Sequence, residues 1–226
     1  MGIVAEHKYY TENKRFDLFS RVIDAISPTY DIEIRSIVEL CGVDKGLGSI
    51  SDRREQNILL RKMLSVAPKE RVPRHRLIRN LIALGEYDPA EIEIRLFERD
   101  FRLDGPAARY KIDLALSRAV RSPGLMDEDR IVLLDKAREL AASAASRFSY
   151  NKAVLTAYCE VGLETARLTG RQDVFDVAIS ELKAAETETG DADITRRIAR
   201  LEKKMTAIAV DGEVEYSAAE LAVDED

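Results

Sequence analysis

The sequence predicts an all-α protein, and three observations lead to this fold class. Ala, Leu, Arg and Glu are abundant, whereas the helix breakers Gly (11 residues) and Pro (6 residues) are scarce in the 226-residue chain. Apolar residues recur at spacings of three and four along almost the whole chain, which is typical of helices with one buried face. No segment of useful length alternates apolar and polar residues as a half-buried strand would.

The first part of the chain, residues 1 to 66, is predicted to be an N-terminal helical segment. Apolar side chains fall on one face of each of three expected helices: Phe16, Phe19, Ile23 and Ile26; Ile34, Ile37, Val38 and Cys41; Leu59, Leu60, Met63 and Val66. Residues 67 to 73 contain Pro68 and Pro73, and each proline disfavours helical conformation at the residue before it. We therefore expect a linker and a subdomain boundary at residues 67 to 73.

From residue 74 to residue 208 the pattern becomes regular and predicts helices joined by turns. The first is expected over residues 74 to 84, and Gly85 provides the left-handed conformation that ends it. Asp88, Pro89 and Glu91 form the signature of a capped N-terminus for the next helix. Further helices are expected after Gly105, over residues 127 to 148, from Asn151 to Gly170, over residues 173 to 187 and over residues 192 to 208.

The turn between the first two of these helices resembles that of the tetratricopeptide repeat, a helix-turn-helix unit of about 34 residues. Such turns commonly hold a glycine, an aromatic residue two positions on and an alanine three positions further. Gly85, Tyr87 and Ala90 fall on these places, and Leu77 and Leu81 match the large apolar positions of the first helix. A small alanine at this place lets the paired helices approach closely.

Looser matches follow along the chain, and they suggest that the unit repeats. They lie at Ala137, Ala141, Ala144 and Asn151, and again at Gly170, Ala178, Leu182 and Ala185. The resemblance implies three degenerate tetratricopeptide-like units over residues 74 to 189, which would form a short α-solenoid. An irregular helical bundle with one coincidental turn is the alternative.

The resemblance also implies a binding surface, because the first helix of each tetratricopeptide unit lines the concave side of the array. It places there His75, Arg76, Arg79 and Asn80 from the first unit, Arg109, Tyr110 and Asp113 from the second, and Thr156, Glu160 and Glu164 from the third. A groove that is basic at one end and acidic at the other would orient an extended or helical peptide.

The last predicted helix carries an apolar stripe with alternating spacings of four and three. Its members are Ile194, Ile198, Leu201, Met205 and Ile208. One interpretation is a capping helix that covers the exposed face of the last hairpin. The other is the seam of a homodimer, although two heptads are too few for an independent coiled coil.

Charge is distributed unevenly along the chain, whose net charge is -6. Residues 53 to 79 hold nine Lys or Arg and two acids. The candidate basic patch consists of Arg53, Arg54, Arg61, Lys62, Arg71 and Arg74. This segment is interpreted as a solvated helix face, as a binding patch for an acidic partner or as a nucleic-acid contact. The last is less favoured, since no aromatic residues interleave with the basic ones. Residues 209 to 226 form an acidic tail that we expect to be disordered.

Catalytic, metal and membrane signatures are missing from the sequence. The two histidines, His7 and His75, lie in no HExxH motif and beside no cysteine nucleophile, so we predict no catalytic residue, no metal site and no cofactor. Cys41 and Cys159 form no ligand pair and are expected to be buried thiols in a reducing compartment. No secretion signal or run of roughly 20 apolar residues is present, so we expect a cytoplasmic protein that makes no membrane contact.

The sequence therefore predicts a non-catalytic interaction module, an adaptor or regulatory scaffold that presents a helical groove to a partner protein or peptide. Such arrays often serve as scaffolds in larger bacterial assemblies, which is an analogy of fold alone. Two alternatives are kept: a nucleic-acid-associated accessory protein that uses residues 53 to 79, and an enzyme with an unrecognised site.

Overall fold

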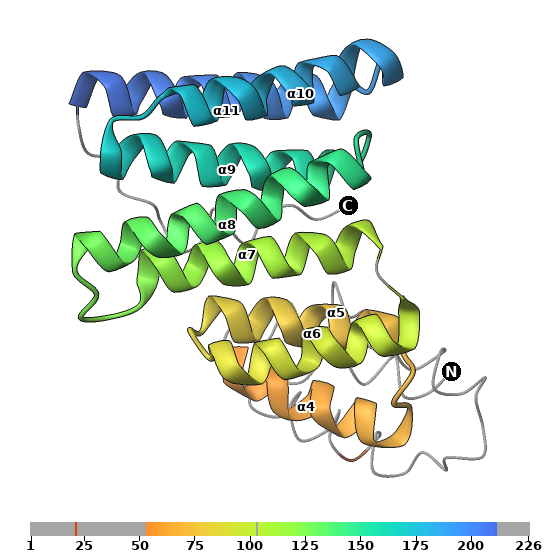
Figure 1. Cartoon of the computed structure of the whole chain (residues 1–226). Helices are drawn as coiled ribbons and strands as arrows, with labels where there is room; N and C mark the ends of the chain where they lie inside the picture. The colour runs from red at the N-terminus through yellow and green to blue at the C-terminus, as the bar shows by residue number, and fades with distance from the viewer. Residues whose placement is uncertain (1–20, 22–52, 103, 212–226) are drawn as a thin grey trace, which may run out of the picture. The chain divides into compact units, whose positions relative to one another are not determined.

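The structure is a computed structural model that describes residue 21, residues 53 to 102 and residues 104 to 211 (Figure 1). Its helices are α4 (Arg53–Val66), α5 (Arg71–Ala83), α6 (Tyr87–Phe101), α7 (Gly105–Arg121), α8 (Asp127–Arg147), α9 (Lys152–Thr169), α10 (Asp173–Thr189) and α11 (Ala192–Asp211). Within these described ranges there is no strand, so the predicted all-α class is confirmed. The helices expected before residue 53 and the tail from residue 212 lie outside the described residues.

The chain divides into two compact units between Phe101 and Arg102, whereas the sequence predicted a boundary at residues 67 to 73. Unit 1 contains α4, α5 and α6, and unit 2 contains α7 to α11. The predicted linker is short because α5 already begins at Arg71 and includes Pro73 in its first turn. A proline is tolerated there, since the N–H group that it lacks would have no helical partner.

In unit 1, α4 packs against α5 and α5 packs against α6. Its buried apolar side chains include Leu59, Leu60 and Met63 from α4, Leu77, Ile78 and Leu81 from α5, and Ala90, Ile94 and Phe97 from α6. These are the faces that the helical spacing predicted. Apolar side chains at spacings of three and four therefore supply the contact between consecutive helices.

In the turn between α5 and α6, the end of α5 has the predicted geometry, whereas the start of α6 does not. Gly85 has a φ of 74°, and the Glu86 N–H donates to the Leu81 carbonyl at 2.9 Å, which closes the end of α5. A Cβ added at Gly85 would lie 4.0 Å from the Tyr87 ring, so this ring lies beside the turn. However, α6 begins at Tyr87, so Asp88 lies inside its first turn and does not precede the helix.

In unit 2, each helix from α7 to α11 packs against the next one, and α9 also packs against α7 and α11. Figure 1 shows these helices as a stack with α9 in its interior. The Asp104 carboxylate accepts a hydrogen bond from the Ala107 N–H at the start of α7, and the Asn151 side chain accepts from Ala153 and Val154 at the start of α9. Gly170 then ends α9 in the left-handed conformation. The cap predicted at Asn151 is thus confirmed.

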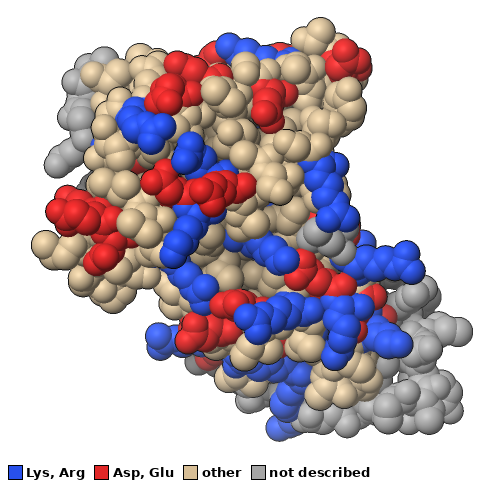
Figure 2. Space-filling view, viewed as in Figure 1, with Lys and Arg blue, Asp and Glu red and all other residues tan. Residues whose placement is uncertain are grey.

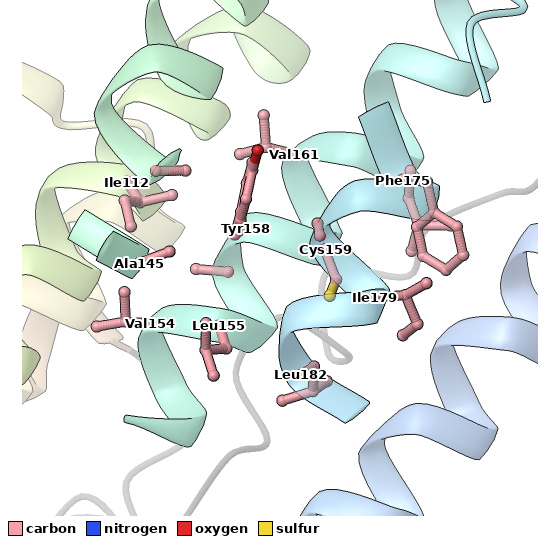
Figure 3. Close-up of a cluster of buried hydrophobic side chains, with 14 of the residues drawn as sticks. Ile112, Ala145, Val154, Leu155, Tyr158, Cys159, Val161, Phe175, Ile179 and Leu182 are labelled. Atoms are coloured by element: carbon pink, nitrogen blue, oxygen red, sulfur yellow. The ribbon is translucent and has the colours of Figure 1, made fainter. Parts of the chain in front are cut away.

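The core of unit 2 surrounds α9. Figure 3 shows Tyr158 and Cys159 of α9 between Ile112 and Ala145 on one side and the side chains of α10 on the other. Gly162 permits this packing, because a Cβ at its position would lie only 2.8 Å from the Phe175 backbone. A glycine in the middle of a helix costs about 1 kcal/mol relative to alanine. Here it allows α9 and α10 to approach closely.

The apolar stripe of α11 faces inward. Ile194, Ile198, Leu201 and Met205 are buried, and they belong to the same core cluster as the α9 and α10 side chains, with Ile208 partly buried against it. The outward positions of α11 include the exposed Arg196, Glu202 and Lys203. The stripe therefore covers the last helix pair and is not available as an exposed dimer seam.

Candidate functional site

The predicted partner-binding residues are divided between the two units. One group lies on α5 in unit 1: His75, Arg76, Arg79 and Asn80. The other group lies on α7 and α9 in unit 2: Arg109, Tyr110, Asp113, Thr156, Glu160 and Glu164. Each group is therefore considered within its own unit.

In unit 1, two of the four predicted residues hold helices together. Asn80 is buried, and its Nδ2 atom donates to Oε1 of the buried Gln56 at 3.0 Å, which joins α5 to α4. His75 accepts a hydrogen bond at Nε2 from Arg71 and lies edge-on against the Phe97 ring, with the ring centroids 4.7 Å apart. Arg76 and Arg79 on the same helix are partly exposed.

One residue of the predicted basic patch, Arg74, is buried inside unit 1. The Arg74 side chain is only 5% exposed, lies 3.5 Å from Glu93 and 3.8 Å from Asp100, and donates to the Pro68 carbonyl. A charge is buried only where partners offset its loss of hydration, so Arg74 fixes α5 to α6 and does not face solvent. The remaining members are exposed or partly exposed: Arg53, Arg54, Arg61, Lys62 and Arg71.

In unit 2, three predicted residues meet in one ion network. The Arg109 guanidinium on α7 donates to Asp113 at 2.7 Å, to Glu160 on α9 at 2.8 Å and to the Ala153 carbonyl at 2.8 Å. The Arg109 and Glu160 side chains are 13% and 14% exposed, while Asp113 is 24% exposed. The structure therefore brings together side chains from two helices that the sequence assigned to different repeat units.

A second group of ion pairs joins the start of α9 to residues 191 to 197, around the start of α11, and its members were not among the predicted site residues. Lys152, next to Ala153, lies 3.4 Å from Asp191 and 3.0 Å from Asp193, and Arg197 donates to Asp193 at 2.9 Å. We call these two groups together the charged seam: Arg109, Asp113, Lys152, Glu160, Asp191, Asp193 and Arg197. In the sequence, the second group is marked locally by Asp191 and Asp193, the two acids just after Gly190. Their pairing with Lys152 spans 39 positions or more, so no local pattern predicts it.

Other predicted groove residues are inside the unit. Tyr110 and Thr156 are buried, and the Thr156 hydroxyl donates to the Lys152 carbonyl of its own helix. Glu164 is also buried and accepts a hydrogen bond from Arg167 at 2.9 Å. These three side chains therefore belong to the packed interior of unit 2.

Within each of the two groups of the charged seam, opposite charges are in contact. Hydrogen bonds from Arg197 and then Lys152 lower the pKa of Asp193 to about 2, and the hydrogen bond with Asp193 raises the pKa of Lys152. Both residues therefore stay charged near neutral pH. Figure 2 shows the same tendency over one face of the molecule, where basic and acidic side chains are interspersed and do not form a field of one sign.

Two findings describe the thiol and the metal-binding groups of the described residues. Cys159 is a free thiol, but burial raises its pKa and disfavours the thiolate that would react. The described ranges contain no cluster of three or more His, Cys, Asp or Glu residues that could hold a metal ion. The charged seam can instead supply fixed hydrogen-bond donors and acceptors to another polar molecule.

Comparison with known proteins does not add an assignment: no family profile, curated protein or solved structure matches the chain. Among the helices of the described ranges, none combines the length and the apolar character needed to cross a membrane.

Proposed function

We propose that this protein is a non-catalytic interaction module and that the charged seam of unit 2 is its partner-binding face. On this proposal α7–α8 and α9–α10 act as tetratricopeptide-like helix pairs, with α11 as the capping helix. The module would serve as an adaptor or scaffold for a partner protein or peptide.

The observation that carries the proposal is the Arg109–Glu160 ion pair between α7 and α9. Its two side chains are mostly withdrawn from water, so their positions are fixed by mutual contact and by Asp113. Charges fixed in this way lose little entropy when a partner binds. They also favour partners with complementary groups and disfavour partners with like charges at the same places.

Asp113 provides the most accessible charge at this end of the seam, with 24% of its side chain exposed. A lysine or arginine of a bound peptide could share this carboxylate with Arg109, because an ionised carboxylate accepts several hydrogen bonds. The proposal thus predicts a partner segment that brings a cation to α7.

The test is to identify the partner and then to measure its affinity for a seam variant. The tagged protein is purified from its native host, and bound proteins are identified by mass spectrometry. The affinity of the purified partner is then measured by calorimetry. Asp113→Lys should weaken binding about tenfold, which corresponds to about 1.4 kcal/mol. Glu139→Lys is the matched charge reversal, at an exposed position of α8 outside the seam.

Equal affinity of the wild type and Asp113→Lys would refute the assignment to this face. The alternative result is a nucleic acid that binds with an affinity that falls steeply with salt and is the same for the wild type and Asp113→Lys. That result would make the basic residues of unit 1 the better candidate for the binding site. Circular dichroism of each variant is needed to establish that it keeps its helical content.

A further inference from the structure

The outward face of α4 in unit 1 combines basic and apolar character. Arg54, Ile58, Arg61 and Ser65 are all exposed, and their spacings of four, three and four place them on one side of the helix. The opposite side carries the buried Leu59, Leu60, Met63 and Leu64, which pack into the unit. We call the exposed side the α4 face.

The α4 face belongs to a basic helix within an acidic chain. Helix α4 holds four basic residues and one acid, so its formal charge is 4 − 1 = +3, against -6 for the whole chain. The Arg61 side chain is 52% exposed and approaches Glu86 only to 4.0 Å, and Glu86 is itself 37% exposed. Exposed pairs of this kind contribute little, so Glu86 is readily replaced by a carboxylate from outside.

Ile58 gives the face a second property, because it is a large apolar side chain that is 47% exposed. One exposed apolar residue is ordinary in a folded protein. Ile58 is distinguished by its basic neighbours: Arg54 precedes it by one helical turn, and Arg61 and Lys62 follow it by one turn. An apolar centre flanked by cations suits a ligand that has the reverse arrangement, with an apolar centre flanked by anions.

This arrangement separates two classes of anionic partner. A nucleic acid would present phosphates to the arginines, but α4 contains no aromatic side chain on which its bases would stack. An acidic amphipathic helix offers carboxylates for the arginines and an apolar side chain for Ile58, because residues one turn apart lie side by side on a helix. The composition of the α4 face therefore favours a protein helix.

We propose that the α4 face is a docking site for an acidic amphipathic helix of a partner protein. An apolar side chain of that helix packs against Ile58, and carboxylates on either side of it pair with Arg54 and Arg61. This surface is in unit 1 and does not depend on the charged seam, so either site can fail without the other.

The experiment measures the binding of a fluorescein-labelled synthetic helix, made of glutamate, alanine and leucine with leucine on one face, to the full chain by fluorescence anisotropy. Ile58→Asn and Arg61→Glu should each weaken binding about tenfold. The matched controls are Val132→Asn, at an apolar position that is 53% exposed, and Lys136→Glu, both on α8; each should bind as the wild type does. Arg61→Gln serves in place of Arg61→Glu if the reversal unfolds unit 1.

Two further probes distinguish a specific site from general attraction. A scrambled peptide of the same composition, which has no leucine face, should bind at least about tenfold more weakly than the designed helix. Equal binding of both peptides would overturn the proposal. Displacement of the designed helix by a single-stranded DNA oligonucleotide, with no effect of Ile58→Asn on either ligand, would also overturn it and would assign the face to nucleic acid.

Discussion

The guanidinium of Arg109 on α7 lies 2.8 Å from the carboxylate of Glu160 on α9, although the residues are 51 positions apart in sequence. Both side chains are mostly buried, so each offsets the desolvation of the other. The pair ties α7 directly to α9, across the sequence of α8 that separates them. It therefore links the packing of unit 2 to the charges that we propose for partner binding.

Removal of Arg109 should destabilise the protein. We expect Arg109→Ala to lower the free energy of unfolding by about 2 to 4 kcal/mol, because Glu160 would lose the partner that offsets its burial. Urea denaturation followed by circular dichroism measures this change. Arg171→Ala is the control, since Arg171 and Asp173 form a pair that is 50% and 69% exposed and should change stability by less than about 1 kcal/mol. Similar losses in the two variants would contradict the prediction.

Arg74 should have a comparable role in unit 1. Arg74→Ala leaves Glu93 and Asp100 without their buried cation, and we expect a loss of about 3 kcal/mol. Arg95→Ala removes a guanidinium that is 73% exposed and pairs with Glu91 on its own helix, so it should cost less than about 0.5 kcal/mol. Urea denaturation of both variants makes the comparison. The interior placement of Arg74 would be refuted if its removal cost no more than that of Arg95.

Stability should fall in acid partly through Asp193. Its pKa is about 2 in the folded protein and 3.8 ordinarily, so the ionised carboxylate stabilises the fold above about pH 4. This contribution is lost as the pH falls through 4 toward 2. The difference corresponds to at most about 2 kcal/mol, and about 1 kcal/mol is expected because the side chain is 27% exposed.

Urea denaturation at pH 2, 3, 4 and 6 measures the Asp193 contribution. Asp193→Asn cannot gain a proton, so its stability should fall less than that of the wild type between about pH 4 and 2. Asp173→Asn, at a 69% exposed carboxylate, is the control and should keep the wild-type dependence. Identical pH dependence in the wild type and Asp193→Asn would contradict the role of this residue.

Gly162→Ala should destabilise unit 2, although alanine is the better helix former. The added methyl would meet the Phe175 backbone at 2.8 Å, and backbone cannot move aside as a flexible side chain can. We expect a loss of about 1 to 3 kcal/mol from the overpacked contact between α9 and α10. Ser143→Ala, at an exposed position of α8, is the control and should be neutral or slightly stabilising. If Gly162→Ala were more stable than the wild type, α9 and α10 would have to be farther apart at this contact than the structure shows.

The α11 stripe should behave as interior. Leu201 is 1% exposed, so Leu201→Glu buries a carboxylate without a partner and should unfold α11 or destabilise unit 2 by about 3 kcal/mol or more. Ala199→Glu, on the exposed side of the same helix, should be tolerated. Analytical ultracentrifugation together with circular dichroism measures the outcome. A well-folded Leu201→Glu monomer obtained from a wild-type dimer would instead identify the stripe as a dimer seam.

Local sequence patterns predicted the helices of the described chain well. Leu77, Ile78 and Leu81 are buried as their spacing indicated, and Gly85 and Asn151 occupy the turn and cap positions expected of them. Such features depend on residues within about one or two turns, so a linear pattern contains them. The start of α5 was the main local error, because a proline within a first turn does not break a helix.

The roles of charged residues could not be predicted in the same way. Arg74 and Arg61 occur in the same basic segment, yet one is buried between two acids and the other is half exposed. Likewise, Arg109 and Glu160 were selected as separate groove residues, but they are each other's partners. Nothing in a local pattern specifies which acid a given arginine will reach.

The sequence by itself determined that this chain is helical, where most of its described helices lie and which of their faces are apolar. Only the tertiary structure decided which charged side chains are buried and which of them pair with one another. An example is Lys152, which lies 3.0 Å from Asp193 although the two residues are far apart in the sequence. The physical reason is that helix formation depends on near neighbours in the chain. The environment of a charge depends instead on which helices dock beside it, and that is fixed only when the whole core has packed.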